Sequence, residues 1–543
     1  MGERASMHSN SGSDTRYDVI IVGAGFAGLY GVHHAARAGL RVLGIEAGDD
    51  VGGTWYWNRY PGARCDVESV DYSYSFDAQL QQSWTWTERF AAQPEIHAYL
   101  RHVADRFDVR RHYRFGTRVT AAEFDETTST WTVGTDRGDT FRSRFVVFAT
   151  GCLSEPIRPD IPGANTFAGE ELFTARWPEA GADLAGKRIA VIGTGSSGIQ
   201  VSPLLARDAT SLTVFQRSPN YSVPMPNRPW TEAEMRQIRE TYPQRREKSS
   251  YAPAATPHES IQTKARELSE DERLAAMEQR WNEGGVLFNK VFPDQNSDMA
   301  ANDIVREFAD AKIRAKIADA AVAADLIPND HPIGTKRICT DVGYYEMFNQ
   351  EHVSLVNLRR EPIEEITATG IRTVDRQLEF DAIVYATGFD AMTGALLSID
   401  PKGANGIRLH EAFADGPVTY LGFGIPGFPN MFSVNSVGTP SVMANMALHS
   451  EQQLDWILAL IEHCRTRDIA RVQARTESAR EWTDHLMEVA AGTLFVRANS
   501  WYLGANVEGK KRVFMPYIGG FGNYRRRCDT ERENGYPGFE LSR

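Results

Sequence analysis

The stretch YDVIIVGAGFAGLYGVHHAARAGLRVLGIEAG, which runs from Tyr17 to Gly48, decides the fold of this chain. Its apolar run over residues 17–22 predicts a short buried strand, residues 29–38 predict a helix, and residues 41–45 predict a second strand. A strand, a helix and a second strand in this order are typical of an α/β unit with a parallel sheet.

The turn between the first strand and the helix has the spacing G-x-G-x-x-G, with Gly23, Gly25 and Gly28. The first glycine permits the tight turn, the second lets a pyrophosphate approach the backbone, and the third lets the helix pack on the strand. The free N–H groups and the positive dipole end of the helix would face the phosphates. Glu46, at the end of the second strand, is placed to accept hydrogen bonds from ribose hydroxyls.

The same arrangement recurs in GKRIAVIGTGSSGIQVSPLLARDATSLTVFQRS, where Gly193, Gly195 and Gly198 form the loop. Here the second strand ends in Arg217, which cannot accept from ribose hydroxyls but can bind a 2′-phosphate and so favours NADP over NAD. Arg217 could instead be a solvated surface charge. The strands that flank this loop are expected over residues 188–192 and 211–216.

Two dinucleotide loops in one chain imply two dinucleotides held together, and this indicates a flavin oxidoreductase. The loop with the acid suits FAD, and the loop with the arginine suits NADPH. Two stretches that end in Ala-Thr-Gly, at Gly151 and Gly388, fit crossings between the two nucleotide domains, where small residues let the chain pass close to a cofactor.

The composition supports a protein of several domains. The chain has 543 residues, which predicts two or three domains, and a net charge of −12, which argues against general nucleic-acid binding. No apolar run is long enough to span a bilayer, so we expect a soluble, cytoplasmic protein. Five cysteines without a CxxC pair or metal-ligand spacing predict neither disulfides nor a metal site. The polar residues 1–16 are no signal peptide; they match an acylation pattern through Gly2 and Ser6, although a disordered tail is the favoured interpretation.

Further segments resemble the Baeyer–Villiger monooxygenases over nearly the whole chain. They are GGTWYWNRYPGARCDVES from Gly52, the loop followed by SSGIQ, GTKR from Gly334, GYYEMFN, ATGFD and NSWYLGAN. The similarity is greatest to the branch of phenylacetone and steroid monooxygenases, and GGVLFNKVFPDQ from Gly284 is similar to the steroid type.

One position departs from the family pattern F-x-G-x-x-x-H-x-x-x-W-P. The segment FAGEELFTARWP supplies the other residues, but Phe173 stands in place of the histidine. The resemblance places this position in a linker between domains, away from the reacting atoms. We therefore expect an active enzyme. The property that Phe173 would change is the coupling of NADPH binding to catalysis.

The resemblance implies that the enzyme uses FAD, NADPH and O2 to convert a ketone into an ester or lactone through a flavin peroxide. Arg337 would stabilise the peroxide and the developing oxyanion, because a guanidinium keeps its charge even when partly buried. Asp66 would hold Arg337 in position, although such a pair could be purely structural. Lys336 and Arg217 would share the 2′-phosphate, and Trp501 would pack over the nicotinamide nucleotide, although these could be ordinary surface or interface residues.

The remaining site residues are also carried over from the resemblance. Tyr72 and Met446 could equally be core residues. Expected flavin contacts are Phe26, Ala27, Thr54, Trp55, Tyr56, Trp57, Arg64, Cys65, Asp66, Tyr72, Val119 and Met446; expected NADP contacts are Thr194, Ser196, Ser197, Ile199, Gln200, Ser218, Lys336, Arg337 and Trp501; and the substrate pocket is expected at Ser441, Val442 and Met446.

The predicted fold class is α/β, with two Rossmann-type domains and a helical insertion. We expect the FAD domain over residues 1–152 and 387–543, the NADP domain over 153–221 and 333–386, and the insertion over 222–332, which lacks strand patterns. The expected partners are a small ketone and O2, without nucleic acid or membrane, and the chain is expected to be a monomer or weak homo-oligomer.

Three other functions compete with this one. A related flavin monooxygenase could oxygenate nitrogen or sulfur, but such enzymes do not need an equivalent of Arg337. A disulfide reductase would need a redox CxxC, which is absent. A nucleotide-dependent sensor or scaffold would draw support from Phe173.

Overall fold

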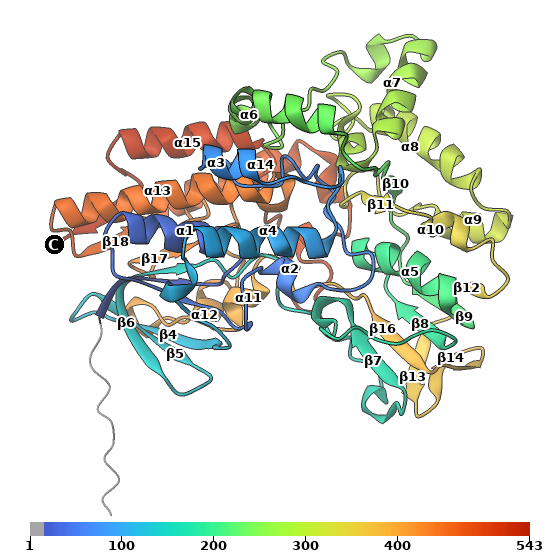
Figure 1. Ribbon diagram of the computed structural model, residues 1–543, viewed down its shortest axis with the longest axis horizontal. Helices are drawn as coiled ribbons and strands as arrows, with labels where there is room; N and C mark the ends of the chain where they lie inside the picture. Colours follow the sequence, from blue (N-terminus) through green and yellow to red (C-terminus); the bar gives the residue numbers. More distant parts are fainter. Residues whose placement is uncertain (1–15) are drawn as a thin grey trace, which may run out of the picture.

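The computed structural model describes residues 16–543, so the acylation pattern at Gly2 and Ser6 lies outside the described residues. Figure 1 shows two α/β bodies side by side. The blue N-terminal and the orange to red C-terminal segments lie together on the left, and the green to yellow middle of the chain forms the right-hand body.

The left-hand body is built on a seven-stranded sheet that mixes parallel and antiparallel pairs. Its order is β3-β2-β1-β6-β5-β4, and β17 also pairs with β6. The strands β1, β2, β3, β6 and β17 are parallel neighbours, whereas β4, β5 and β6 form an antiparallel meander. The bounds are β1 Arg16–Val22, β2 Val42–Ile45, β3 Tyr113–Arg114, β4 Val119–Asp125, β5 Thr130–Thr135, β6 Thr140–Phe148 and β17 Met431–Ser433.

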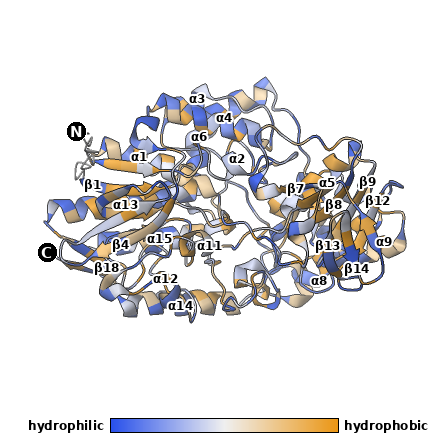
Figure 2. Cartoon of the chain, turned by 90° about the horizontal axis from the view of Figure 1, so that it is seen from below, coloured by the Kyte–Doolittle hydropathy of each residue, from blue (hydrophilic) through white to orange (hydrophobic). Residues whose placement is uncertain are grey.

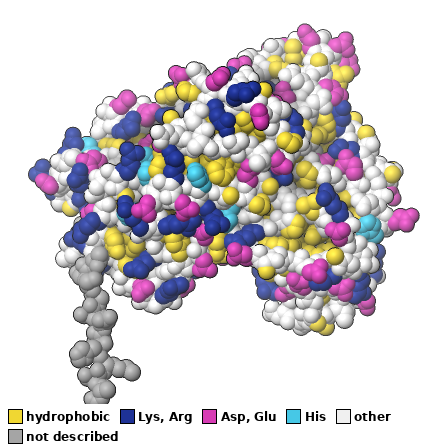
Figure 3. All heavy atoms as spheres, in the orientation of Figure 1, with side chains coloured by type: hydrophobic (Ala, Val, Ile, Leu, Met, Phe, Trp, Pro, Cys, Tyr) yellow, Lys and Arg dark blue, Asp and Glu magenta, His cyan; other side chains and the backbone are white. Residues whose placement is uncertain are grey.

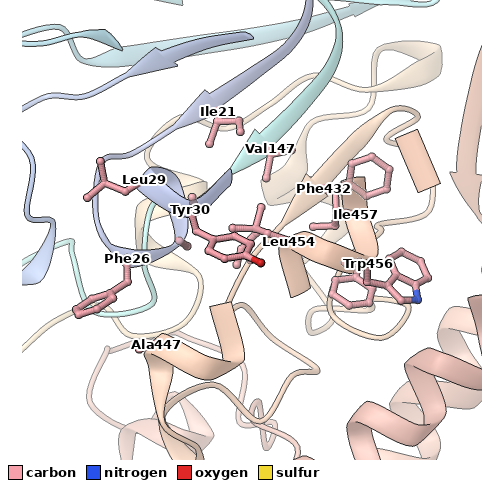
Figure 4. Close-up of a cluster of buried hydrophobic side chains, with 14 of the residues drawn as sticks. Ile21, Phe26, Leu29, Tyr30, Val147, Phe432, Ala447, Leu454, Trp456 and Ile457 are labelled. Atoms are coloured by element: carbon pink, nitrogen blue, oxygen red, sulfur yellow. The ribbon is translucent and has the colours of Figure 1, made fainter. Parts of the chain in front are cut away.

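Two long helices from opposite ends of the chain cover this sheet. Helix α1 (Phe26–Arg37) packs against α13 (Met446–Thr466). Gly31 allows their close approach, because a Cβ atom there would lie 3.0 Å from Leu454 Cδ2 and 3.0 Å from Ile21 Cδ1. Figure 4 shows the resulting core, in which Leu29 and Tyr30 of α1 meet Leu454 and Ile457 of α13 beside strand residues Ile21 and Val147.

The right-hand body contains a five-stranded parallel sheet with the order β12-β9-β8-β16-β7. Helix α5 (Ser196–Asp208) follows β8, and the strands are deeply apolar, as the orange colour of β8, β9 and β12 shows in Figure 2. A small antiparallel sheet of β13, β14 and β15 precedes β16. The bounds are β7 Glu170–Phe173, β8 Arg188–Ile192, β9 Ser211–Gln216, β12 Val353–Asn357, β13 Ile363–Thr367, β14 Gly370–Thr373, β15 Gln377–Glu379 and β16 Ala382–Tyr385.

The predicted strands and helices of both glycine units are confirmed, with β8 and β9 at the predicted bounds and β1, α1 and β2 within a few residues of them. The two-domain α/β fold is therefore as expected.

The segment 222–332 consists of helices joined by loops, except at its start. Ser222–Pro224 forms strand β10 and pairs in parallel with β11 (Cys339–Asp341), so the expectation that this segment lacks strands was wrong there. Its helices divide between the two bodies: α6 packs into the left-hand core and the later helices into the right-hand core. The bounds are α6 Glu232–Tyr251, α7 Glu270–Glu283, α8 Met299–Arg314 and α9 Ala320–Leu326. The domain boundaries themselves stay a prediction.

The surface carries charges of both signs. Figure 3 shows Lys and Arg side chains interspersed with Asp and Glu over the visible face. Within residues 16–543 every helix is too short or too polar to cross a membrane.

Candidate active site

The first glycine loop is shaped by close backbone contacts. Gly23 has φ +111°, and a Cβ atom there would lie 2.4 Å from the carbonyl oxygen of Ala149, in the Ala-Thr-Gly segment after β6. A Cβ atom at Gly28 would lie 1.8 Å from the carbonyl oxygen of Gly23. Gly28 therefore permits the contact between helix and turn, while Gly25 borders the cavity at the start of α1.

Glu46 supports this loop from behind. Its buried carboxylate accepts hydrogen bonds from the backbone N–H groups of Ala24 and Gly48, each at 2.7 Å. Burial raises the pKa of Glu46, although these hydrogen bonds oppose the shift. Each carboxylate oxygen keeps a second lone pair, so Glu46 can stabilise the turn and also accept from a ribose hydroxyl.

A long cavity starts at this loop and runs toward the beginning of α13. Asn435 borders it with a buried side-chain oxygen that has no hydrogen-bond partner among the described residues. A polar group left unpaired at a cavity wall suits a ligand that donates a hydrogen bond. The predicted residues that line the cavity are Gly23, Gly25, Phe26, Ala27, Glu46, Thr54, Trp55, Trp57, Tyr72, Val119, Val442 and Met446.

Other predicted flavin contacts lie outside the cavity wall. The ring of Tyr56 lies 4.3 Å from the guanidinium carbon of Arg59, Arg64 forms an ion pair with Glu88, and Cys65 is buried. Asp66 faces Arg337 instead of the cavity. The last predicted glycine-loop residue outside the cavity wall is Gly28, which packs against the turn.

Several cavity residues were not predicted from the sequence. Ala149–Glu155 begin with the Ala-Thr-Gly stretch, whose expected position close to a cofactor was the available signal. Arg176 also borders the cavity, and its guanidinium carbon lies 4.4 Å from the centre of the Trp57 ring. Burial lowers the pKa of Arg176, with the nearby Arg118 acting in the same direction. Further residues that were not predicted are Val22, Ala24, Ile45, Ala47, Gly52, Gly53, Asn58, Thr117, Arg118, Ala395, Ser398, Ile399, Val434 and Ser450.

The second glycine loop repeats the first. Gly193 has φ +113°, and a Cβ atom there would lie 2.4 Å from the carbonyl oxygen of Ala386, in the second Ala-Thr-Gly segment. A Cβ atom at Gly198 would lie 2.1 Å from the carbonyl oxygen of Gly193. Gly195 differs, since no heavy atom of residues 16–543 lies within 4 Å of its added Cβ. Gly195 and Ser196 are exposed, which leaves the start of α5 open to a phosphate.

The residues after this loop join the two bodies. Gln200 accepts a hydrogen bond from the Tyr60 hydroxyl at 2.8 Å and donates to the Arg64 carbonyl at 3.1 Å. Ile199 is fully buried in the right-hand core, so its side chain is a packing residue. Ser197 is half-buried, and Thr194 donates to the Ser218 carbonyl at 2.9 Å.

Basic side chains gather beyond the end of β9. Arg217 is exposed at this edge, and Lys336 is half-buried. Burial lowers the pKa of Lys336, and the positive charges of Arg359 and Arg217 act in the same direction, while Asp330 opposes them. These cations are therefore close enough to repel one another, which suits a dianionic phosphate.

Arg337, the residue after Lys336, is held in place by Asp66. Its Nη2 donates to both Asp66 carboxylate oxygens at 2.8 and 2.7 Å, and its Nε donates to Asp66 Oδ2 at 3.0 Å. Nη1 donates to the carbonyl of Val442, a cavity residue, at 2.7 Å. Burial opposes the charge of Arg337, but Asp66 outweighs it and raises the pKa of Arg337. Arg337 therefore touches the cavity wall through the Val442 carbonyl and keeps its positive charge.

The predicted substrate and nicotinamide residues are only partly together. Val442 and Met446 border the cavity, whereas Ser441 is buried and donates to the Asn435 carbonyl at 3.0 Å. Trp501 packs on an apolar cluster that contains Cys152 and Met515, and it does not line the cavity.

Phe173 is the last residue of strand β7, so its expected place in a linker was wrong. Its ring stacks on Tyr385 of β16 with centroids 4.6 Å apart, and the guanidinium carbon of Arg158 lies 5.6 Å from its centre. The position is therefore a packed edge of the right-hand sheet.

Comparisons with known proteins agree with this geometry. Residues 20–275 match the family model described as pyridine nucleotide-disulphide oxidoreductase. An NADP-bound steroid monooxygenase of known structure is 51% identical, has a TM-score of 0.93, and covers 97% of this chain and 100% of its own.

Curated relatives match over almost their full length. The 2-oxo-Δ3-4,5,5-trimethylcyclopentenylacetyl-CoA monooxygenase of Pseudomonas putida is 39% identical over 98% of this chain and 100% of its own. A phenazine N-monooxygenase of Lysobacter antibioticus is 37% identical over 97% of both chains. A Baeyer–Villiger monooxygenase of Pseudooceanicola batsensis is 38% identical over 96% of this chain and 95% of its own. With these matches and both dinucleotide loops in place, the chain belongs to the Baeyer–Villiger monooxygenases.

Proposed function

We propose that this chain binds FAD and NADPH and uses O2 to convert a bulky ketone into an ester or lactone. The observation that carries the proposal is the Arg337–Asp66 pair, because Arg337 donates to the carbonyl of the cavity residue Val442 and directly follows Lys336 of the basic cluster. The glycine turns and the unpaired oxygen of Asn435 support the fit to FAD. The open start of α5 supports the fit to NADPH.

Bound FAD, once reduced by NADPH, supplies the activated oxygen; the side chains of this protein supply charge and position. Arg337 donates through Nε and Nη2 to Asp66, and of the two N–H groups on Nη1 one donates to the Val442 carbonyl while the other has no partner among residues 16–543. That N–H can donate to an oxygen that gains negative charge during the reaction. Asp66 fixes the direction of this donor, which is the arrangement that electrostatic stabilisation requires.

This function is tested by rapid mixing of the reduced protein with O2, combined with analysis of the products. The protein reduced by NADPH should regain its oxidised flavin absorbance slowly without substrate and quickly with ketone, and it should form one ester per NADPH. Immediate reoxidation with release of H2O2 and no ester would contradict the proposal.

Oxygenation of nitrogen is the second candidate, because one nearly full-length relative is an N-monooxygenase. A ketone and an aromatic N-heterocycle offered in one assay separate the two functions. Ester as the main product supports the first function, and N-oxide as the main product supports the second.

We further propose a cytoplasmic location, no nucleic-acid or membrane partner, and a monomer or weak homo-oligomer. The five cysteines, all without a disulfide, support a reducing compartment. Sedimentation at two protein concentrations measures the oligomeric state, and a stable higher oligomer at low concentration would contradict the last part.

A further inference from the structure

A third arginine lies beside the basic cluster, one strand farther along the right-hand sheet. Strand β12 ends at Asn357, and the next residue, Leu358, donates its backbone N–H to the Gln216 carbonyl at 2.8 Å. This bond carries the chain along the end of β9, so Arg359 lies beside Arg217 and Ser218 at the carboxyl edge of the sheet. Ligands of α/β proteins bind at this edge.

Arg359 has two partners here. Its Nη2 donates to Ser218 Oγ at 2.9 Å, and the same guanidinium forms an ion pair with Asp330. Asp330 is fixed in turn by a hydrogen bond of 2.5 Å with His331 Nδ1. The bond with His331, followed by that with Arg359, holds the pKa of Asp330 below its usual value, so Asp330 stays charged and keeps Arg359 in place.

The contact with Arg359 decides what Ser218 can do. A guanidinium only donates, so Ser218 Oγ must be the acceptor. The hydroxyl hydrogen of Ser218 therefore stays available to donate, which suits an anion. The carbonyl of Ser218 is held by Thr194 of the glycine loop, so the hydroxyl keeps a fixed position relative to that loop.

We propose that Arg359, anchored by Asp330, orients the Ser218 hydroxyl toward the 2′-phosphate and is a third determinant of the choice of NADPH over NADH. This inference rests on the proposed use of NADPH. Asp330 balances the positive charge of Arg359. The charges of Arg217 and Lys336 therefore remain to attract the dianionic 2′-phosphate.

The adjacent Arg360 is a matched control. It donates to Asp325 Oδ1 at 2.6 Å and has no contact with Ser218. Asp325 also accepts from Asn357 at 3.1 Å, so loss of Arg360 leaves that carboxylate with a partner. Arg359→Ala and Arg360→Ala change the net charge equally, one residue apart.

The test is a calorimetric titration of the FAD-bound protein with NADP+ and, separately, with NAD+. Arg359→Ala should weaken NADP+ binding about tenfold and leave NAD+ binding within about twofold, because a charge-assisted contact that is half exposed contributes less than a buried one. Arg360→Ala should change neither by more than about twofold.

The outcomes separate this inference from the proposed function. If wild type prefers NADP+ and Arg359→Ala keeps that preference, the role of Arg359 is overturned and the use of NADPH stands. If Arg359→Ala weakens NADP+ and NAD+ equally, Arg359 contacts the shared adenosine and the inference also fails. A wild-type protein without preference overturns both.

A double-mutant cycle tests the route through Ser218. If Arg359 acts by orienting the hydroxyl, Arg359→Ala should have little effect on NADP+ binding in a Ser218→Ala background. Additive effects of the two substitutions would show that Arg359 acts without Ser218, contrary to the proposal.

Discussion

Arg337 and Asp66 are 271 residues apart in the chain and form three hydrogen bonds. At the scale of single residues we expect Arg337→Ala to retain FAD and to be reduced by NADPH, since the hydrogen bonds of this side chain go to Asp66 and Val442, which lie outside both glycine loops. Ester formation should fall at least about 10²–10³-fold, because a preorganised charge at the oxyanion is lost. Anaerobic reduction rates and ester yield measure the two parts separately, and an unchanged ester yield would place the chemistry elsewhere.

Glu451 is a buried carboxyl group with an unusual pKa. It accepts from the Ser75 backbone N–H at 2.6 Å and from the Ser75 hydroxyl, and burial raises the pKa of Glu451 from 4.5 to about 7. As the pH rises from about 4.5 to 7, the unfolded chain loses this proton before the folded protein does. The free energy of unfolding should therefore fall by up to about 3 kcal/mol through this window.

Glu451→Gln tests this dependence. The variant has no titrating group there, so its free energy of unfolding should fall less between pH 5 and pH 8 than that of wild type. Denaturant midpoints at both pH values measure this difference. Parallel pH dependences of the two proteins would show that Glu451 titrates normally.

At the scale of elements, helix α6 is fixed to the left-hand body by charged groups. Arg245 donates to both Asp71 carboxylate oxygens at 2.6 and 2.7 Å and to Glu68 at 2.9 Å, while Arg246 donates to the backbone carbonyls of Val70 and Asp71 at 3.0 Å. These acceptors lie in the segment that begins at Asp66 and ends at the cavity residue Tyr72. The helix thus supports the part of the chain that positions Arg337.

Arg245→Gln should lower the free energy of unfolding by about 3 kcal/mol, because Asp71 is only 1% exposed and would lose its ionic partner. Arg228→Gln, which breaks the exposed pair with Glu234 beside the same helix, is the control and should cost less than about 1 kcal/mol. Equal losses in the two variants would show that the ion pair does not anchor α6.

Strand β7 carries the substitution of the family histidine. Phe173→His would keep a flat ring against Tyr385 but would place a polar ring beside Arg158. We expect a small loss of stability, about 1 kcal/mol, and turnover within about threefold of wild type. Thermal unfolding and the ratio of ester to H2O2 measure both. A large gain in that ratio would show that Phe173 weakens coupling.

At the scale of the whole molecule, the pocket is assembled from distant segments. The Val442 carbonyl meets Arg337 of the right-hand body, and Met446 begins α13 of the left-hand body. The proposed preference for a bulky ketone rests on the similarity to a steroid monooxygenase. Burying a larger apolar ketone gains about 25 cal/mol per Å².

We therefore expect kcat/KM to be higher for progesterone and phenylacetone than for cyclohexanone. Steady-state NADPH oxidation with matched product analysis measures the three values. Cyclohexanone preferred by tenfold or more would contradict a pocket for bulky ketones and leave the family assignment intact.

Both dinucleotide units could be predicted from the sequence alone, because the contacts that require Gly28 and Gly198 lie within their own loops. A Cβ atom at Gly28 or Gly198 would overlap a carbonyl oxygen five residues earlier, and this steric requirement is visible in the spacing alone. The change from Glu46 to Arg217 at the end of the second strand likewise has a local chemical meaning.

Only the tertiary structure decided how distant segments meet. The sequence motifs did not reveal that α6 packs into the left-hand core, that Phe173 ends a strand, or that Arg359 contacts Ser218. These contacts join residues between 141 and 212 positions apart. Whether such residues meet depends on the burial of whole apolar faces and on the pairing of buried charges across elements, and no local spacing encodes either.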